Sequence, residues 1–341
     1  MTSSSNITDL AERRFRRLVL LTVLIIYLLI LAGGIVRGTG SGMGCPDWPK
    51  CFGRWIPPTS VTQLPPNYQA IYGAKLKGEV EFNATKTWIE YVNRLLGVLS
   101  GFFVLATLLA SLPLYRRNPL LVWGSFAALL LIGANGWLGS KVVSTELAQY
   151  MITAHLLLAV LVLFSLLFVF IRSRGNLWSK EALKLTNKTS IKSVAIVALV
   201  LTMIQLVLGT EVRDSLDKVV KLLGYEQRDN WISGLDWRFY VHRSFSLVVL
   251  GVHLFLVSKL KPTQPSTLIS GLSKALIAVV VAEIATGAIM GYFAVPAAAQ
   301  PIHLLLAVLL VGIQFIIIAL VTPTLLVGKQ HDIVKADLQP N

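Results

Sequence analysis

Eight apolar runs constrain the fold of this chain more than any other feature, because about 20 apolar residues suffice to span a bilayer as a helix. The runs cover about 18–36, 88–112, 119–140, 147–171, 191–212, 237–258, 268–290 and 299–321. Only 14% of the residues are charged, whereas soluble chains carry about 25%. The sequence therefore predicts an all-α membrane protein with eight transmembrane helices, and it excludes a soluble globular domain.

The first four runs and the last four are two copies of one unit, as two pairs of motifs show. The pairs are WIEYVNRLLG at 88–97 with WRFYVHRSFS at 237–246, and AHLLLAVLV at 154–162 with IHLLLAVLL at 302–310. The offsets between matched positions, 242 − 93 = 149 and 303 − 155 = 148, agree within one residue. We therefore predict two pseudo-symmetric four-helix bundles, formed by residues 1–175 and 176–341.

The net charge of +14 is distributed unevenly between the two ends of the predicted helices. The basic residues flank apolar runs, where they orient a membrane protein, so we do not expect nucleic acid as a partner. Seventeen of them share one side with few acids: Arg13, Arg14, Arg16, Arg17, Arg116, Arg117, Arg172, Arg174, Lys180, Lys184, Lys188, Lys192, Lys259, Lys261, Lys274, Lys329 and Lys335. That side should be cytoplasmic. We expect both termini there and the connection at 38–87 outside.

The connection at 38–87 is the longest in the chain, and it holds both cysteines, Cys45 and Cys51, in the segment GTGSGMGCPDWPKCFG. A structural zinc site usually has four ligands, and no His or further Cys lies in this segment. A disulfide is therefore the leading interpretation, provided that the loop faces the oxidising side. The matching connection at 214–236 is about half as long and has no cysteine.

Three histidines, His155, His242 and His303, lie within roughly two turns of the outer ends of their runs. Ionisable side chains inside a membrane are costly and are functional by default. A neutral imidazole is a good ligand for heme iron, and His242 and His303 come from two helices of one bundle. We expect them to clamp one heme from opposite sides, the alternative being hydrogen bonds between helices. His253, which is matched by Val104, is interpreted as an interfacial or packing residue.

The first copy keeps His155 but has Asn93 where the second copy has His242. Because asparagine is a poor iron ligand, this half should offer a heme at most one imidazole. Glu90 lies three residues before Asn93, on the same helix face, and Phe239 occupies its place in the second copy. This favours a catalytic role for Glu90 and Asn93 at an open iron face. Of the two candidate catalytic residues, the carboxylate of Glu90 would have the polar or acid–base role, and Asn93 would leave the iron face open. The alternative is that Glu90 is a boundary carboxylate paired with Arg94.

Four arginines, Arg37, Arg94, Arg213 and Arg243, recur in matched pairs at the predicted outer boundary. Arginine binds carboxylates through two N–H groups at once, so these residues could hold heme propionates. The alternative is that they simply extend their charged groups to the membrane surface. The glycines of Gly133-x-x-Gly136-x-x-Gly139, with Gly287 and Gly291, would allow close helix approach or make room for a flat macrocycle.

Together these motifs resemble the heme A synthase family over nearly the whole chain. The segments that carry the resemblance are GGIVRGTGSGMGCPDWPKC, EYVNRLLG, AHLLLAVL, FYVHR and IHLLLAVL. The resemblance implies an enzyme that oxidises the C8 methyl group of heme O to a formyl group, giving heme A for terminal oxidases. It implies a heme b held by His242 and His303, and a heme O site with His155 and Glu90 at matching positions. The family pattern E-x-x-H is altered here, because Asn93 replaces the histidine.

The resemblance also implies a bacterial cytoplasmic membrane as the location. Expected partners are heme O, heme A and membrane lipid, with heme O synthase, cytochrome oxidase assembly factors and a second copy of the chain as further candidates. Two other functions share some of these features. A membrane b-type cytochrome would also use paired histidines, although with ligands near both membrane faces. A heme carrier without catalysis would accommodate Asn93 but would have no need of Glu90.

Overall fold

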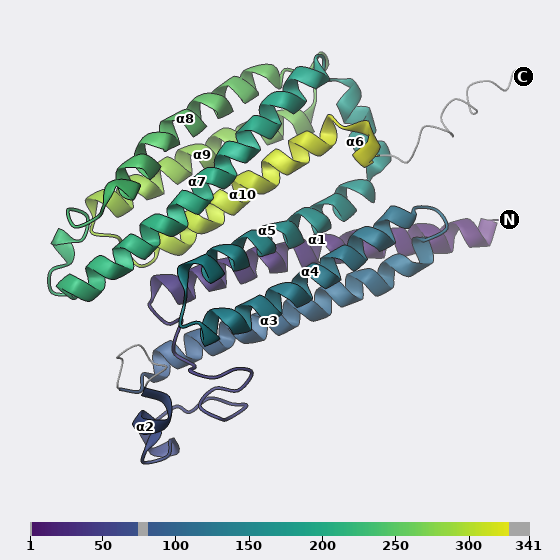
Figure 1. The fold of residues 1–341 in the computed structure, drawn as a ribbon. Coiled ribbons are helices and arrows are strands. Elements are labelled where there is room, and N and C mark those ends of the chain that lie inside the picture. The colour runs from purple at the N-terminus through teal and green to yellow at the C-terminus, as the bar shows by residue number, and fades with distance from the viewer. Residues whose placement is uncertain (1, 74–80, 327–341) are drawn as a thin grey trace, which may run out of the picture.

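The computed structural model describes residues 2–73 and 81–326, with side chains from residue 11 onward, and all its extended regular elements are helices (Figure 1). Isolated β-bridges occur only at Cys51–Arg54 and Leu185–Pro262 within that part. Of the basic residues assigned to the cytoplasmic side, Lys329 and Lys335 lie outside the described residues. The predicted all-α fold is confirmed.

Eight helices of the described part are long and apolar enough to cross a membrane, as predicted. They are α1 (Thr2–Gly38, apolar from Ala11), α3 (Ala84–Ser111), α4 (Pro119–Ser144), α5 (Gln149–Arg172), α7 (Lys188–Leu223), α8 (Trp237–Lys259), α9 (Thr267–Tyr292) and α10 (Ala299–Leu320). Shorter helices are α2 (Tyr68–Tyr72), α6 (Gly175–Leu183) and α11 (Pro323–Leu326).

Helix α7 differs most from its prediction, since it continues to Leu223 rather than ending near residue 212. Its last three turns are amphipathic: Leu216 and Val219 pack against Trp231 and Val295. On the exposed side, Asp214 forms an ion pair with Lys218 across one turn. The burial of that apolar face keeps the helix intact beyond the bilayer-length run. The predicted connection at 214–236 is correspondingly shorter.

The long helices pack in two groups of four, in chain order (Figure 1). In one group α1 contacts α3 and α5, and α4 lies between α3 and α5. In the other, α7 contacts α8 and α10, and α9 lies between α8 and α10. The groups meet where α1 and α5 pack against α10, and where α5 touches α7. The pseudo-symmetry of the bundles and the domain division near residue 175 stay predictions.

The two ends of the molecule carry different structures (Figure 1). The basic end gathers the start of α1, the turn between α3 and α4, and α6. Arg16 Nε donates to the carbonyl of Ser173 at 2.8 Å, and Arg117 pairs with Glu12 at 3.3 Å. The opposite end carries the connection between α1 and α3, which includes α2. The long helices thus lie between a basic end of the molecule and an opposite end that carries the long connection between α1 and α3.

Candidate heme-binding site

The imidazoles of His242 on α8 and His303 on α10 face each other inside the second group of helices. Their ring centres are 6.3 Å apart and their planes are inclined at 73°. A metal ion held between two imidazoles places the ring centres roughly 6 Å apart, given a metal–nitrogen bond of about 2 Å on each side. The observed spacing therefore fits two axial ligands of one iron.

A glycine on a neighbouring helix lies against each of the three histidines. A Cβ atom added at Gly209 of α7 would lie 3.3 Å from Cε1 of His242. At Gly287 of α9 it would lie 3.5 Å from Cε1 of His303, and at Gly139 of α4 it would lie 3.2 Å from Cε1 of His155. The absent side chains leave the space in which the rings lie. Of the glycines predicted to allow close helix approach or room for a macrocycle, Gly139 and Gly287 lie against histidine rings, and a Cβ atom at the others would meet no atom within 4 Å. Gly209 was not singled out from the sequence.

His303 is held by two side chains of α9. Its Nδ1 lies 2.6 Å from Oε2 of Glu283 and 2.8 Å from Oγ1 of Thr286. Glu283 was missed in the sequence, although a signal was available, because it is the only acid between Thr267 and Tyr292. A lone carboxylate in an apolar span calls for a functional partner, and that partner is the imidazole.

The first group of helices has a matching arrangement with fewer polar contacts. A Cβ atom at Gly33 of α1 would lie 4.0 Å from Oδ1 of Asn93, so Gly33 faces Asn93 as Gly209 faces His242. The chain offsets agree with this, because Gly209 follows Gly33 by 176 residues and the matched arginines Arg213 and Arg37 are also 176 residues apart, 213 − 37 = 176. Among the described residues, Nδ1 of His155 and Oδ1 of Asn93 are buried without a hydrogen bond of normal geometry. Orphaned buried polar atoms are rare in native proteins and indicate a missing partner.

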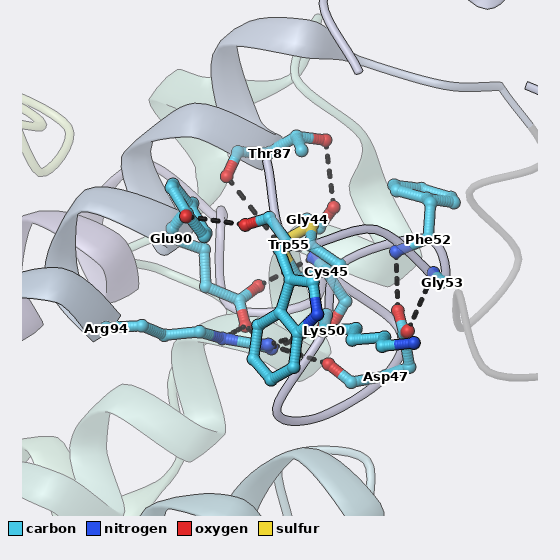
Figure 2. Close-up of a disulfide and its surroundings, with 12 residues drawn as sticks. Gly44, Cys45, Asp47, Lys50, Phe52, Gly53, Trp55, Thr87, Glu90 and Arg94 are labelled. Carbon is cyan, nitrogen blue, oxygen red and sulfur yellow. Dashed lines mark hydrogen bonds and ion pairs between the residues drawn. A yellow bond between two sulfur atoms is a disulfide. The ribbon is translucent and has the colours of Figure 1, made fainter. Parts of the chain in front are cut away.

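Glu90, near the start of α3, is buried and bound to the cysteine-bearing loop (Figure 2). Its Oε2 accepts a hydrogen bond from the backbone N–H of Cys45 at 2.9 Å. Its Oε1 accepts from Nη2 of Arg94 at 2.5 Å and from Nε at 3.2 Å. The pairing with Arg94 that the sequence left open is therefore formed. Neither a hydrogen bond nor an ion pair joins Glu90 to Asn93 or His155 in the described part of the chain.

Arg94 fastens the same loop to α3 (Figure 2). Nη1 donates to the carbonyls of Asp47 at 2.6 Å and Lys50 at 3.0 Å, and Nη2 donates to that of Cys45 at 3.0 Å. With its two bonds to Glu90, all five N–H groups of the guanidinium are engaged. Binding a propionate would require Arg94 to release part of this network.

The loop that Glu90 and Arg94 hold is closed by a disulfide between Cys45 and Cys51, as predicted. Asp47 accepts from the backbone N–H groups of Phe52 at 2.6 Å and Gly53 at 2.8 Å, which shapes the turn within the disulfide-closed segment (Figure 2). Both cysteines are fully buried. The disulfide is thus part of the cover over the N-terminal end of α3.

The other three arginines have different surroundings. Arg37 and Arg213 both form ion pairs with Asp217, the second at 2.7 Å, and Arg213 also donates to Gln300. These contacts join α1, α7 and α10, which belong to both groups of helices. Arg243 is exposed, and its guanidinium makes neither a hydrogen bond nor an ion pair to any described residue, although its backbone carbonyl accepts from the hydroxyl of Ser246 at 2.6 Å. Among the four, Arg243 is therefore the one whose guanidinium is free to meet a propionate.

The fold and these contacts define a class: a multi-pass helical membrane protein with two facing imidazoles and a buried carboxylate behind one of them. The sequence model of the family described as cytochrome oxidase assembly protein matches residues 16–315. The chain belongs to that family.

Relatives named heme A synthase come from several bacteria. The protein of Shewanella oneidensis is 26% identical over 192 residues, which cover 55% of this chain and 54% of the relative. That of Rhodopseudomonas palustris is 29% identical over 227 residues, covering 61% and 59%. That of Rickettsia bellii is 24% identical over 335 residues, covering 89% and 96%. The chain spans little more than half the length of the first two relatives and nearly all of the third.

Proposed function

We propose that this protein is a heme A synthase, which oxidises the C8 methyl group of heme O to a formyl group. The observation that carries the proposal is the facing pair His242 and His303, in a chain whose relatives bear that name. The conversion removes four electrons from the methyl carbon, so it requires an oxygen source and an oxidant from outside the chain, either dioxygen or another electron acceptor. Two successive hydroxylations would give a geminal diol, and loss of water from the diol gives the aldehyde. The product, heme A, serves terminal oxidases.

The second group of helices would hold a heme b through His242 and His303. Three observations support the fit: the 6.3 Å ring separation, the glycines beside both rings, and the carboxylate behind His303. A heme b bound there supplies one-electron transfer. The surrounding helices would shield this heme from water. Glu283 and Thr286 fix the imidazole of His303, which would be one of its two ligands. Arg243 would neutralise a propionate at the outer boundary.

The first group of helices would receive heme O, with His155 as its single imidazole. Asn93 stands where a second imidazole would be, which leaves one side of the ring open to chemistry. We assign Glu90 an acid–base role at this open side, supported by its burial and its place one turn from Asn93. Arg94 and the N–H of Cys45 fix the carboxylate in position.

We propose that the protein lies in a bacterial cytoplasmic membrane with both termini inside and the disulfide loop outside. The concentration of Lys and Arg at one end of the helices supports this orientation. Its partners would include heme O and heme A, with heme O synthase and oxidase assembly factors as the sources and recipients of heme. A homo-oligomer is part of the same proposal.

The decisive experiment is to identify the hemes that the protein binds and makes. We would express it in cells that supply heme O but lack their own heme A synthase, and separate extracted hemes by chromatography and mass. Heme A or hydroxylated heme O is expected. Heme b alone would contradict the proposal and favour a b-type cytochrome or a carrier.

The ligand assignment is tested by spectra of single variants. His242→Ala and His303→Ala should each abolish the six-coordinate low-spin b-type spectrum, because each removes one axial imidazole. His155→Ala is the matched control, a histidine of the other group of helices, and should leave that spectrum intact. Survival of the spectrum in both of the first two variants would show that other residues bind the iron.

A further inference from the structure

We infer that Glu283 and Thr286 are positioning residues for His303, and that they distinguish a permanently held heme from an exchangeable one. The contact between Glu283 and His303 makes the second iron site strongly electron-donating. The absence of such a contact leaves the ligand in the first site weaker. This inference rests on the proposed function only in taking a heme as the ligand of these histidines.

Among the described residues, His303 is the only ion-pair partner of Glu283. Glu283 Oε2 lies 2.6 Å from Nδ1 of His303, and the carboxylate side chain is 14% exposed. Its other oxygen, Oε1, is buried without a hydrogen bond. No Lys or Arg of the described part pairs with it. A carboxylate at this depth is costly unless a partner compensates it, and the imidazole is that partner.

The chemistry of the contact follows from the tautomer of the ring. A neutral imidazole has one N–H, and a carboxylate can only accept, so the proton of His303 lies on Nδ1. The hydroxyl of Thr286 donates to the carbonyl of Ala282 at 2.9 Å, which leaves its lone pairs for the same N–H. Nε2 is therefore an unprotonated donor for a metal, and the hydrogen-bonded carboxylate raises its basicity.

The first site lacks both contacts at the matched positions. The offset of 148 that relates His155 to His303 places Asn135 at the position of Glu283 and Leu138 at that of Thr286, since 283 − 135 = 148 and 286 − 138 = 148. A neutral amide cannot strengthen an imidazole as a carboxylate does. His155 contacts the uncharged backbone of Asn135, and its Nδ1, like that of His242, makes no hydrogen bond of normal geometry to a described residue. Among the three histidines, His303 alone has a carboxylate partner in the described part of the chain.

A carboxylate behind His303 and none behind His155 would suit one heme that stays bound and one that exchanges. An electron carrier should stay bound through every turnover, whereas a substrate must enter and its product must leave. Mutation of a residue that hydrogen-bonds to a metal ligand typically lowers metal affinity by about 10–100-fold. Because negative charge favours the ferric state, the same contact should lower the reduction potential of the iron that His303 binds.

The test is a redox titration of the b-type heme in the full-length protein and in Glu283→Gln. The substitution keeps the side-chain size and removes the charge. We expect the ferric state to lose at least tenfold in relative affinity, which is a rise of about 59 mV in midpoint potential for one electron. Thr286→Val should shift the potential in the same direction by less, and Glu283→Asp should restore most of the original value.

The reciprocal change supplies the matched experiment. Asn135→Glu places a carboxylate beside His155, and the fraction of the heme of the first site that survives a detergent wash should rise. An unchanged potential in both Glu283→Gln and Thr286→Val would overturn the inference. So would a folded Glu283→Gln protein that loses its heme and does not regain it in Glu283→Asp. Thr286→Val keeps the test decisive if Glu283→Gln fails to fold.

The inference and the proposed function fail in different ways. If extraction yields heme b alone but Glu283→Gln shifts its potential, the positioning role stands and the synthase activity does not. If heme A forms but neither variant moves the potential, the activity stands and the positioning role is overturned.

Discussion

Glu90 and Arg94 together hold the cysteine-bearing loop, and Glu90 is also the residue to which we assign acid–base chemistry. Their side chains are 4% and 13% exposed, and together they hold the backbone of Cys45, Asp47 and Lys50. Breaking a buried ion pair by removing one partner costs about 3–5 kcal/mol, because the other charge is left uncompensated. A loss of activity on removing Glu90 therefore has two physical causes, which a second substitution must separate.

We expect Glu90→Ala to stop the conversion of heme O and to loosen the loop, seen as faster hydrogen exchange of the amides at 44–55. Glu90→Gln retains an acceptor for the N–H of Cys45 but cannot exchange a proton as a carboxylate does. It should preserve most of the loop protection and still lose turnover. Normal turnover in Glu90→Gln would contradict the acid–base role and leave Glu90 as an anchor of the loop.

Asn93 is the residue at which this chain departs from the pattern of the family it resembles. Gly33 lies opposite Asn93, as Gly209 lies opposite His242, so an imidazole can be accommodated there. We expect Asn93→His to make the substrate heme low-spin and to slow turnover, because a second imidazole closes the open side of the iron. Absorption spectra and product analysis measure both effects. Asn93→Ala, which adds no ligand, is the control, and unchanged or faster turnover in Asn93→His would show that the open side is not needed.

Helices α7, α8 and α10 are joined by a buried polar network that their counterparts lack. His253 donates from Nδ1 to the carbonyl of Val249 at 2.6 Å, and its Nε2 accepts from Nε2 of Gln314 at 2.6 Å. The same amide nitrogen donates to Oγ1 of Thr202 at 2.8 Å. Of the two readings that the sequence left for His253, interfacial or packing, its full burial fits the packing role. The matched residues of the first group are apolar and buried: Ile26, Val104 and Leu166.

The first group of helices has three apolar residues where the second has this polar network, and this difference predicts how the network responds to mutation. Gln314→Leu alone should lower the free energy of unfolding by about 1–3 kcal/mol, because it leaves Nε2 of His253 buried without a partner. The triple variant Thr202→Ile, His253→Val, Gln314→Leu copies the apolar set and should recover most of the loss. Unfolding in detergent, followed by circular dichroism, measures both. A triple variant less stable than the single one would show that the network is not interchangeable with apolar packing.

At the scale of the whole molecule, the two groups of helices are held together by close packing and by charge. A Cβ atom at Gly34 of α1 would lie 3.0 Å from Cα of Pro301 on α10. One turn further along α1, Arg37 pairs with Asp217 of α7. The relative placement of the groups therefore depends on a residue without a side chain at the point where α1 and α10 cross.

Gly34→Val should separate α1 from α10 and lower the free energy of unfolding by about 1–3 kcal/mol, the usual cost of overpacking. Gly97→Val is the control, because a Cβ atom at Gly97 of α3 meets no atom within 4 Å. Thermal unfolding and retention of the bound hemes in detergent measure the difference. Equal effects of the two substitutions would contradict a close α1–α10 contact.

The orientation of the molecule can be tested through its disulfide. Cys45 and Cys51 should be protected from alkylation before reduction, and after reduction an impermeant alkylating reagent should label them from outside intact spheroplasts. The control is Ser173→Cys at the basic end, made in a chain without the two native cysteines, and it should remain unlabelled. Mass spectrometry counts the labelled thiols. Two free thiols before reduction would contradict the disulfide, and labelling of Ser173→Cys from outside would contradict the orientation.

The eight spans were predictable from the sequence alone, whereas the pseudo-symmetry of the two bundles and the roles of the candidate histidines stay predictions. Span length depends on bilayer thickness and apolar composition, which are local properties of the chain. Internal repetition pairs positions without any knowledge of their contacts, and this singled out His242 and His303. The disulfide was predictable because the chain has only two cysteines and they lie close together.

Only the tertiary structure decided which polar groups meet. It placed Arg94 on the carbonyls of the cysteine-bearing loop, Arg37 and Arg213 on Asp217, and Glu283 behind His303. It also extended α7 to Leu223, because Leu216 and Val219 found an apolar surface that lies elsewhere in the chain. Hydrogen bonds and ion pairs act over a few ångströms between residues of any sequence separation. Local patterns therefore determine where helices form, whereas the packing of those helices determines which side chains become partners.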